Sequence, residues 1–169
     1  MLTIYTDGAV SKNGTEEAYG GFGFVCVETG MTHSAPVFKA TNQICELLGV
    51  ITACQYAEKA LGSDYKERFP QEQIEIRSDS AYIINCYKQQ WYKNWQANGW
   101  KNSKKESVAN RELWELLIPY FINPCFNFVK VVGHSGDKYN ELADKYANKG
   151  KAEAKQAREY FNKAIKERS

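Results

Sequence analysis

The sequence predicts an α/β fold in which a mixed sheet of five strands is flanked by helices. Three short apolar segments near the start follow one another across turns, which is typical of antiparallel strands. Two later strand-like segments are separated by helical patterns, and such connections require parallel pairing with right-handed crossovers. A length of 169 residues, 43% of them hydrophobic, fits one globular domain. We therefore expect residues 1–169 to form a single domain.

The first three strands are expected close to the N-terminus. Apolar and polar residues alternate from Leu2 to Asp7, and Asp7-Gly8 then indicates a turn. The segment from Phe22 to Glu28 is rich in aromatic and β-branched residues, which favour strands. After a turn at Thr29-Gly30, the segment from Met31 to Phe38 can return as its hairpin partner.

A helix is expected to connect these strands to a fourth. Apolar residues recur at helical spacing from Asn42 to Leu61, with Thr41 or Asn42 as the N-cap. The segment from Gln73 to Arg77 then predicts a strand, and Ser80 can cap the helix that follows it. The remaining elements are a helix carrying Trp91 and Trp95, a helix over about Asn110 to Phe121, a strand over Phe126 to Val132, and a basic C-terminal helix from about Asp137 whose apolar stripe reaches Phe161 and Ile165.

The cysteines and the apolar runs exclude several classes of protein. Five cysteines occur at irregular spacing without a C-x-x-C pair, which argues against a disulfide framework and against a thiolate zinc site. We expect reduced thiols that act as small apolar side chains. No run is long and apolar enough to span a membrane, and no charged leader precedes a long apolar stretch. These features predict a cytoplasmic protein without membrane contact.

The net charge of +2 conceals two cationic segments. From Ser80 to Lys105 there are five lysines and no acidic residue, together with three of the four tryptophans. From Lys145 to Ser169 there are eight Lys or Arg residues against three Asp or Glu, for which a solvated helix face is the simpler interpretation. The rest of the chain is therefore acidic. A basic, aromatic segment on an acidic body favours an enzyme that binds nucleic acid and holds a cation among carboxylates.

Three acidic residues occupy positions that suit ligand binding. Asp7 and Asp79 each follow a predicted strand, and ligands bind at the carboxyl ends of strands in open α/β sheets. Glu46 shares a helical face with Val50 and Ala53, and a carboxylate on an apolar face needs a partner or a cation. Taken alone, Asp7 before a glycine also has an ordinary explanation as a turn residue, and Asp79 before a serine has one as part of a helix cap.

A fourth acid lies near the start of the last helix, where Asn140 and Asp144 are four residues apart on one face. If Asp144 joins the other three, four negative charges meet in one site. Each pair about 4 Å apart costs on the order of 4 kcal/mol at an effective dielectric constant of about 20, so bound cations are required. Hard cations such as Mg²⁺ prefer carboxylate oxygens, and two of them about 3.5–4 Å apart recur in phosphodiester hydrolysis.

Five segments of the chain, in their order and spacing, resemble the signature blocks of type 1 ribonuclease H. The resemblance spans nearly the whole chain. It implies the ribonuclease H-like fold and an endonuclease that hydrolyses the RNA strand of RNA/DNA hybrids, leaving 5′-phosphate and 3′-hydroxyl ends. The segments are Ile4 to Gly8, Thr41 to Leu47, Ser78 to Ser80, Val132 to Gly136, and Asn140 with Asp144.

The resemblance also implies the roles of the site residues. It assigns Asp7 and Asp79 as principal metal ligands, Glu46 as a ligand that also contacts the nucleic acid, and Asp144 as a ligand of the second metal. Two Mg²⁺ ions are implied with substrate, with Mn²⁺ as a substitute. His134, in a loop bracketed by glycines, matches the family histidine that assists proton transfer or product release.

The nucleic-acid contacts are implied in the same way. The segment from about 88 to 105 resembles the family's basic protrusion, which grips the DNA strand, and we expect Trp91 and Trp95 to lie in the core there. Gln43 stands where many members have Asn, so this position departs from the family pattern. The expected contacts are Trp100, Lys101, Lys104 and Lys105 in the protrusion, and Asn13, Thr41, Asn42, Gln43 and Asn140 elsewhere.

We therefore expect a monomeric, Mg²⁺-dependent ribonuclease H whose partner is an RNA/DNA hybrid, with no obligatory protein partner. Two alternatives stay open. Another nuclease of the same fold, such as a DNA exonuclease or a junction resolvase, would share the acids but has no reason to carry the basic segment with its tryptophans. An inactive hybrid-binding module would lack one of the acids, and none is missing here.

Overall fold

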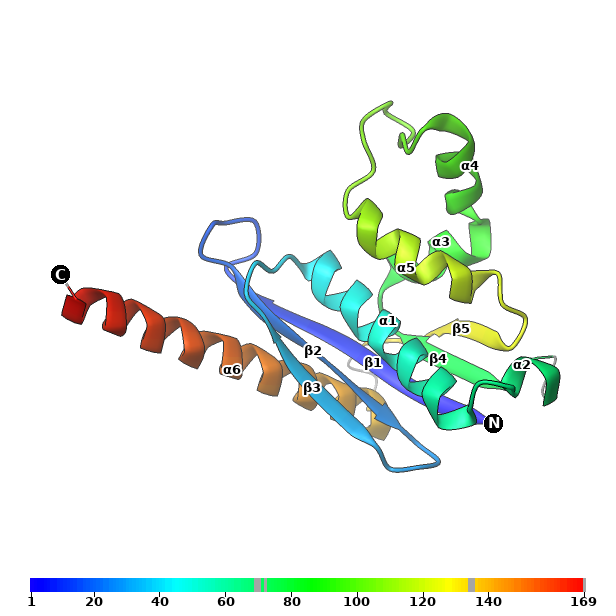
Figure 1. The fold of residues 1–169 in the computed structure, drawn as a ribbon, viewed down its shortest axis with the longest axis horizontal. Helices are drawn as coiled ribbons and strands as arrows, with labels where there is room; N and C mark the ends of the chain where they lie inside the picture. Colours follow the sequence, from blue (N-terminus) through cyan, green and yellow to red (C-terminus); the bar gives the residue numbers. More distant parts are fainter. Residues whose placement is uncertain (69–70, 72, 134–135, 169) are drawn as a thin grey trace.

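Figure 1 presents the computed structural model, which describes residues 1–68, 71, 73–133 and 136–168. Most of the expected elements are present, and the short helix α2 is an addition. In chain order they are β1 (Leu2–Ser11), β2 (Tyr19–Cys26), β3 (Thr32–Val37), α1 (Asn42–Leu61), α2 (Tyr65–Arg68), β4 (Ile74–Ser78), α3 (Ala81–Gln89), α4 (Trp91–Asn98), α5 (Arg111–Phe121), β5 (Phe126–Lys130) and α6 (Lys138–Arg168).

The strands form one mixed sheet in the order β3-β2-β1-β4-β5. The first three strands pair antiparallel, whereas β4 pairs in parallel with both β1 and β5. This arrangement confirms the fold class that the sequence predicts. It follows from the connections, because turns join the first three strands and helices join the later ones.

The end of β1 differs from the sequence-based expectation. β1 does not stop at Asp7 but continues to Ser11, because its pairing with β2 extends to Ser11 and Tyr19. The parallel pairing with β4 ends earlier, at Thr6 and Ser78. Asp7 is therefore the first residue of β1 beyond the parallel pairing, at the point where β1 and β4 part.

Helices cover both faces of the sheet, with α1, α3 and α5 on one side and α6 on the other (Figure 1). The main core lies on the first side, where Ile4, Ile76 and Phe128 of the sheet pack with Leu47 of α1 and Trp114 of α5. The five cysteines are buried free thiols, as expected. Within the described residues, no helix combines the length and the apolar character needed to cross a membrane.

Glycines bring α6 very close to the other face of the sheet. A Cβ atom built at Gly21 would lie 2.2 Å from Lys151 N, and one at Gly150 would lie 2.2 Å from Ala35 O. Gly23 is approached in the same way by Tyr146 and Ala147. Because real side chains at these positions would force the helix outward, the glycines set the distance between α6 and the sheet.

The C-terminal part of α6 projects beyond the sheet (Figure 1). Ala154 is buried, whereas Phe161 and Ile165 are exposed, so the predicted apolar stripe is covered only along its first part. The Arg158 guanidinium donates to the backbone carbonyls of Glu16 and Glu17, which lie in the turn between β1 and β2.

Two predicted helix caps are present at the edge of the sheet where β1 and β4 part. Thr41 Oγ1 accepts a hydrogen bond from Ile44 N at 3.1 Å at the start of α1. Ser80 Oγ accepts one from Ile83 N at 3.3 Å at the start of α3. Both helices therefore begin beside the acidic residues of the expected site.

Candidate active site

Three of the expected metal ligands meet where β1 and β4 part. One carboxylate oxygen from each of Asp7, Glu46 and Asp79 lies within 4.8 Å of the other two. Asp7 follows the last parallel residue pair on β1, Asp79 follows the end of β4, and Glu46 belongs to the first turns of α1. Acidic side chains from three elements that are far apart in the sequence thus lie close together.

Gly8 allows α1 to reach this point. A Cβ atom at Gly8 would lie 2.7 Å from Glu46 N and 2.9 Å from Cys45 Cβ, so no side chain fits between β1 and the helix. The Gly8 N–H also donates to Asp7 Oδ1 at 2.9 Å. The Asp7-Gly8 pair therefore supplies both a carboxylate and the space that lets Glu46 approach it.

The fourth acid, Asp144, comes from the second turn of α6. It lines one pocket of about 440 Å³ together with the other three acids. Asn148, one turn further along α6, donates from Nδ2 to Asp144 Oδ1 at 3.2 Å and to its backbone carbonyl at 3.0 Å. Asn148 thereby holds the Asp144 carboxylate in a fixed orientation beside the other acids.

Burial perturbs the acid–base properties of two of these residues. Burial, the charge of Asp79 and a hydrogen bond with Asp144 together raise the pKa of Asp7 to about 8. Burial and the charges of Asp7 and Asp79 raise the pKa of Glu46 well above its usual range. The Gly8 N–H lowers both pKa values, but its effect is smaller. Without a cation, the folded protein therefore favours the protonated form of Asp7 at neutral pH, and the same environment disfavours a charge on Glu46.

The donor set fits a hard divalent cation. Glu46 is only 7% exposed, and its Oε2 atom has no hydrogen-bond partner among the residues that the structure describes. A buried carboxylate oxygen without a donor is costly, and a cation would remove this cost. Clustered carboxylate oxygens are the ligands that Mg²⁺ and Mn²⁺ prefer.

The predicted role of His134 cannot be compared with the structure, because His134 and Ser135 lie outside the described residues. The loop nevertheless begins beside the acids, since a Cβ atom at Gly133 would lie 3.1 Å from Asp79 Oδ2. On its other side, Gly136 has a φ of +83°, a conformation that favours glycine.

Four of the expected nucleic-acid contacts form an exposed strip beside the acidic pocket. Asn42 and Gln43 line this pocket, and Thr41 precedes them as the N-cap of α1. Asn13, from the turn between β1 and β2, accepts a hydrogen bond from Asn42 N to its Oδ1 atom at 3.2 Å. The four residues, all exposed, thus form a continuous surface that we call the α1 strip.

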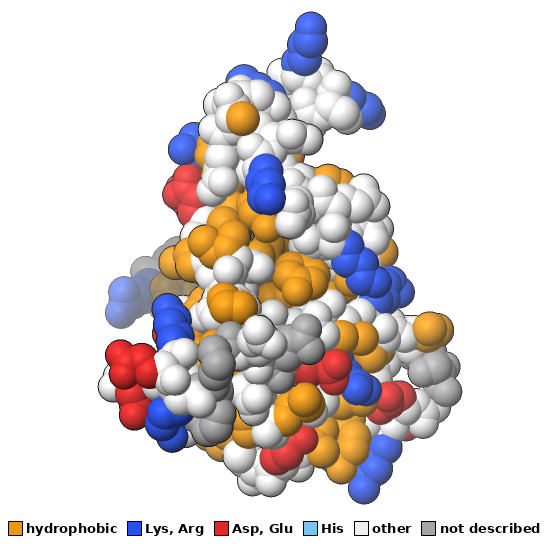
Figure 2. All heavy atoms as spheres, turned by 90° about the vertical axis from the view of Figure 1, so that its right-hand side faces the viewer, with side chains coloured by type: hydrophobic (Ala, Val, Ile, Leu, Met, Phe, Trp, Pro, Cys, Tyr) orange, Lys and Arg blue, Asp and Glu red, His pale blue; other side chains and the backbone are white. Residues whose placement is uncertain are grey.

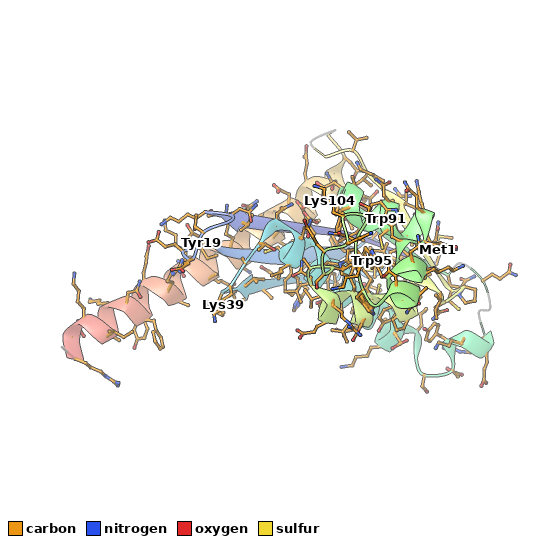
Figure 3. The ribbon with its side chains drawn as sticks, turned by 90° about the horizontal axis from the view of Figure 1, so that it is seen from above. Met1, Tyr19, Lys39, Trp91, Trp95 and Lys104 are labelled. Carbon is orange, nitrogen blue, oxygen red and sulfur yellow. The ribbon has the colours of Figure 1, made fainter. Side chains whose placement is uncertain are left out.

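The basic protrusion lies on the other side of the acids and consists of α4 and the loop that follows it. Lys101, Lys104 and Lys105 are exposed there. In Figure 2, the charged side chains over this upper part of the molecule are mostly Lys and Arg. In Figure 3, seen from above, Lys104, Trp91 and Trp95 lie on the right-hand side of the view, and Lys39 lies toward the left. The acidic pocket is lined by Asn42 and Gln43 of the α1 strip and by Tyr82, which also lines a hollow in the protrusion, so it adjoins both regions.

Tyr82, on α3, connects these two regions and was missed by the sequence analysis. Its side chain lines both the acidic pocket and a second hollow of about 650 Å³ in the protrusion. Trp91, which the sequence places in the core, is only partly buried and lines this second hollow. The one available signal for Tyr82 was its position three residues after Asp79, on the first turn of the helix that Ser80 caps.

Two of the residues expected to contact the nucleic acid are buried in this structure. Trp100 is 8% exposed, because its backbone adopts a φ of 64° and turns the ring back against Trp95, at 5.8 Å, and the Arg111 guanidinium, at 4.9 Å. Asn140, in the first turn of α6, is 4% exposed. Both side chains are therefore largely covered in the protein alone, and their contact with a nucleic acid stays a prediction.

A profile of the family described as RNase H matches residues 1–152. The chain belongs to the RNase H family. Ribonuclease H of Syntrophomonas wolfei is 43% identical over 148 residues, which cover 86% of this chain and 92% of that protein. Ribonuclease H of Clostridium botulinum is 38% identical over 151 residues, covering 87% and 93% of the two chains. These findings confirm the resemblance and the expectation of a ribonuclease H enzyme.

The fold also matches a solved structure of an RNase H domain. The solution structure of the PFV RNase H domain superposes with a TM-score of 0.67 at 23% identity, covering 89% of this chain and 94% of that domain. The ribonuclease H-like fold is therefore confirmed. The last part of α6, beyond residue 152, lies outside the family match.

Proposed function

We propose that this protein is an endonuclease that hydrolyses the RNA strand of RNA/DNA hybrids. The observation that carries the proposal is the convergence of three carboxylates within 4.8 Å, one of which has a buried oxygen without a hydrogen-bond partner. Relatives named ribonuclease H, 38–43% identical over most of the chain, support this substrate. The products would carry 5′-phosphate and 3′-hydroxyl ends.

We propose that Asp7, Glu46, Asp79 and Asp144 hold two Mg²⁺ ions, for which Mn²⁺ can substitute. When bound, such a pair of cations supplies an activated water and stabilises the leaving oxygen of a phosphodiester. The acids themselves must be ionised to serve as ligands, so Asp7, whose pKa is raised to about 8, releases its proton on binding at neutral pH. Asn148 contributes by holding Asp144, and His134 is proposed to assist proton transfer or product release.

The flanking surfaces are proposed to select the hybrid. Asn13, Asn42 and Gln43 carry amides that both donate and accept, which suits the 2′-hydroxyls and base edges of an RNA strand in the shallow minor groove. Thr41 uses its oxygen as the acceptor of the helix cap, so its hydroxyl proton can be donated to a phosphate. Across the acids, the lysines of the protrusion suit the phosphates of the DNA strand.

We further propose that the protein acts as a monomer of one domain, since the four proposed ligands line one pocket within this domain. The test compares labelled RNA/DNA hybrid, double-stranded DNA and single-stranded RNA, each in Mg²⁺ and in EDTA. We expect the RNA strand of the hybrid to be cleaved in Mg²⁺ and not in EDTA, and the other two substrates to stay intact. Cleavage of duplex DNA instead would favour the DNA exonuclease or the resolvase, and binding of the hybrid without cleavage would favour the inactive module.

A further inference from the structure

A chain of hydrogen bonds behind the acids connects the sheet to the start of α6. Arg77 Nη1 donates to Tyr5 Oη at 2.7 Å, and Tyr5 Oη donates to Asp137 Oδ2 at 3.2 Å. Arg77 is itself held by Glu75, whose carboxylate lies 2.7 Å from Arg77 Nη2. We propose that Tyr5 and Asp137, supported by Arg77, are positioning residues for the reaction, because they set the position of Asp144 relative to Asp7. This inference rests on the proposed function.

The sheet register places the hydrogen bonds of Arg77, Tyr5 and Asp137 directly behind the acids. Tyr5 and Arg77 are partners in the parallel pairing of β1 and β4. Asp7 and Asp79 each follow two residues later in the sequence. Because residues two apart on a strand share a face, Tyr5 and Asp7 both point toward α6. Tyr5 is thus the strand side chain next to Asp7 on the face that α6 covers.

Asp137 uses its two carboxylate oxygens for two different tasks. Oδ1 accepts from Tyr139 N at 2.9 Å and from Asn140 N at 3.2 Å, and so caps the first turn of α6. Oδ2 accepts from Tyr5. The Tyr5 ring also stacks on the Tyr139 ring, with centroids 5.6 Å apart. Asp137 therefore fixes the first turn of α6 both internally and against β1.

The position of this turn determines where Asp144 lies. Asp144 follows Asp137 by seven residues, which is about two helical turns and returns to the same face. Between them, Ala143 is fully buried against Tyr5 and Val25. The close glycine contacts of α6 lie further along, from Tyr146 to Lys151, so they do not hold the first turn. The hydrogen bond between Tyr5 and Asp137 supplies that restraint.

The substitution Tyr5→Phe tests the inference with little disturbance, because it removes the hydroxyl and keeps the stacked ring. We expect kcat on the hybrid to fall about 10-fold with KM within about 2-fold, and Mn²⁺ affinity, measured by calorimetry without nucleic acid, to fall by a similar factor. Asp137→Ala should have the same effects. Asp137→Asn keeps an oxygen for the cap and a polar group for Tyr5, so it should retain most of the wild-type kcat and affinity.

Tyr65→Phe is the matched control, because it also removes a buried, hydrogen-bonded hydroxyl. Tyr65 Oη donates to Glu58 Oε2 at 2.9 Å and accepts from Asn123 Nδ2 at 2.8 Å, away from the acids. This variant should lose stability while it keeps the wild-type kcat and Mn²⁺ affinity. The inference is overturned if Tyr5→Phe binds Mn²⁺ as tightly as the wild type, or if Tyr65→Phe weakens kcat and Mn²⁺ binding equally. If the wild type does not cleave the hybrid, the proposed function fails, whereas the Mn²⁺ comparison still decides the positioning role.

Discussion

The carboxylates of Asp7 and Glu46 approach within 4.8 Å of each other, one from a strand and the other from a helix that packs on that strand. The approach depends on Gly8, where any side chain would collide with the backbone of α1. Both pKa values are raised, chiefly by burial. The folded protein thus holds two acids in an arrangement that is unfavourable unless they bind protons or cations.

The raised pKa of Asp7 predicts how the stability of the metal-free protein depends on pH. The pKa is about 8 in the folded state against 3.8 for the free side chain, so the folded state binds this proton more tightly than the unfolded state. The resulting stability is fully present below about pH 4 and is lost as the pH rises through about 8. Urea unfolding in EDTA should show a free energy of unfolding that falls from about pH 5 to about pH 9, and Asp7→Asn should flatten this fall. A wild-type stability that rises over this range would contradict the prediction.

Asp79→Asn should separate catalysis from stability. We expect it to abolish cleavage of the hybrid, because a neutral amide is a much poorer ligand for Mg²⁺ than a carboxylate. It should also leave the metal-free free energy of unfolding unchanged or raise it by about 1.4 kcal/mol, the equivalent of a tenfold change in a protonation equilibrium. Activity assays and urea titrations in EDTA give the two values. A large loss of metal-free stability would instead mark Asp79 as a structural residue.

Gly150→Ala should lower stability, because its added Cβ would lie 2.2 Å from Ala35 O across the interface between α6 and the sheet. Forcing an extra carbon into a packed interface typically costs about 1–3 kcal/mol, and displacement of α6 would also move Asp144. Urea unfolding measures the loss. Gln156→Ala, at an exposed position of the same helix, is the control and should change stability by less than about 0.5 kcal/mol. Equal stability of Gly150→Ala and the wild type would show that α6 is free to move outward.

Replacement of Lys101, Lys104 and Lys105 by alanine should raise KM for the hybrid and flatten the salt dependence of binding. Each lysine that neutralises a phosphate contributes about 1 to the slope of log affinity against log salt concentration. Binding titrations at several salt concentrations measure this slope. The control replaces Lys155, Lys163 and Lys166, exposed on the projecting part of α6, and should leave the slope nearly unchanged. An unaltered slope in the first variant would show that the protrusion does not touch the nucleic-acid backbone.

The sequence predicted those parts of the fold and site that depend on local pattern. The helical spacing from Asn42 to Leu61 placed Glu46 on the buried face, and Thr41 and Ser80 are present as caps. The antiparallel and parallel strand pairings were predicted from which strands are joined by turns and which by helices. Asp7 and Asp79 are brought together because each directly follows the last residue pair of the parallel pairing between β1 and β4.

Features that depend on contacts between distant segments were not predictable. The sequence around Trp100, with Gly99 and Lys101 beside it, indicates an exposed loop, yet the ring is buried because Arg111, from the next helix, covers it. In the same way, the sequence around Tyr5 indicates only an ordinary strand residue. Its hydrogen bond with Asp137 becomes visible only when α6 lies on the sheet. The continuation of β1 past Asp7 depends on its pairing with β2.

The central claim is that the clustered carboxylates hold the cations required to hydrolyse the RNA strand of a hybrid. The most direct test measures cleavage of a hybrid labelled in its RNA strand, over a range of Mg²⁺ concentrations, by the wild type and by Glu46→Gln. We expect cleavage of the RNA strand by the wild type that stops in EDTA, and loss of cleavage in Glu46→Gln while the variant still binds the hybrid. Cleavage by the wild type in EDTA, or undiminished cleavage by Glu46→Gln, would contradict the claim.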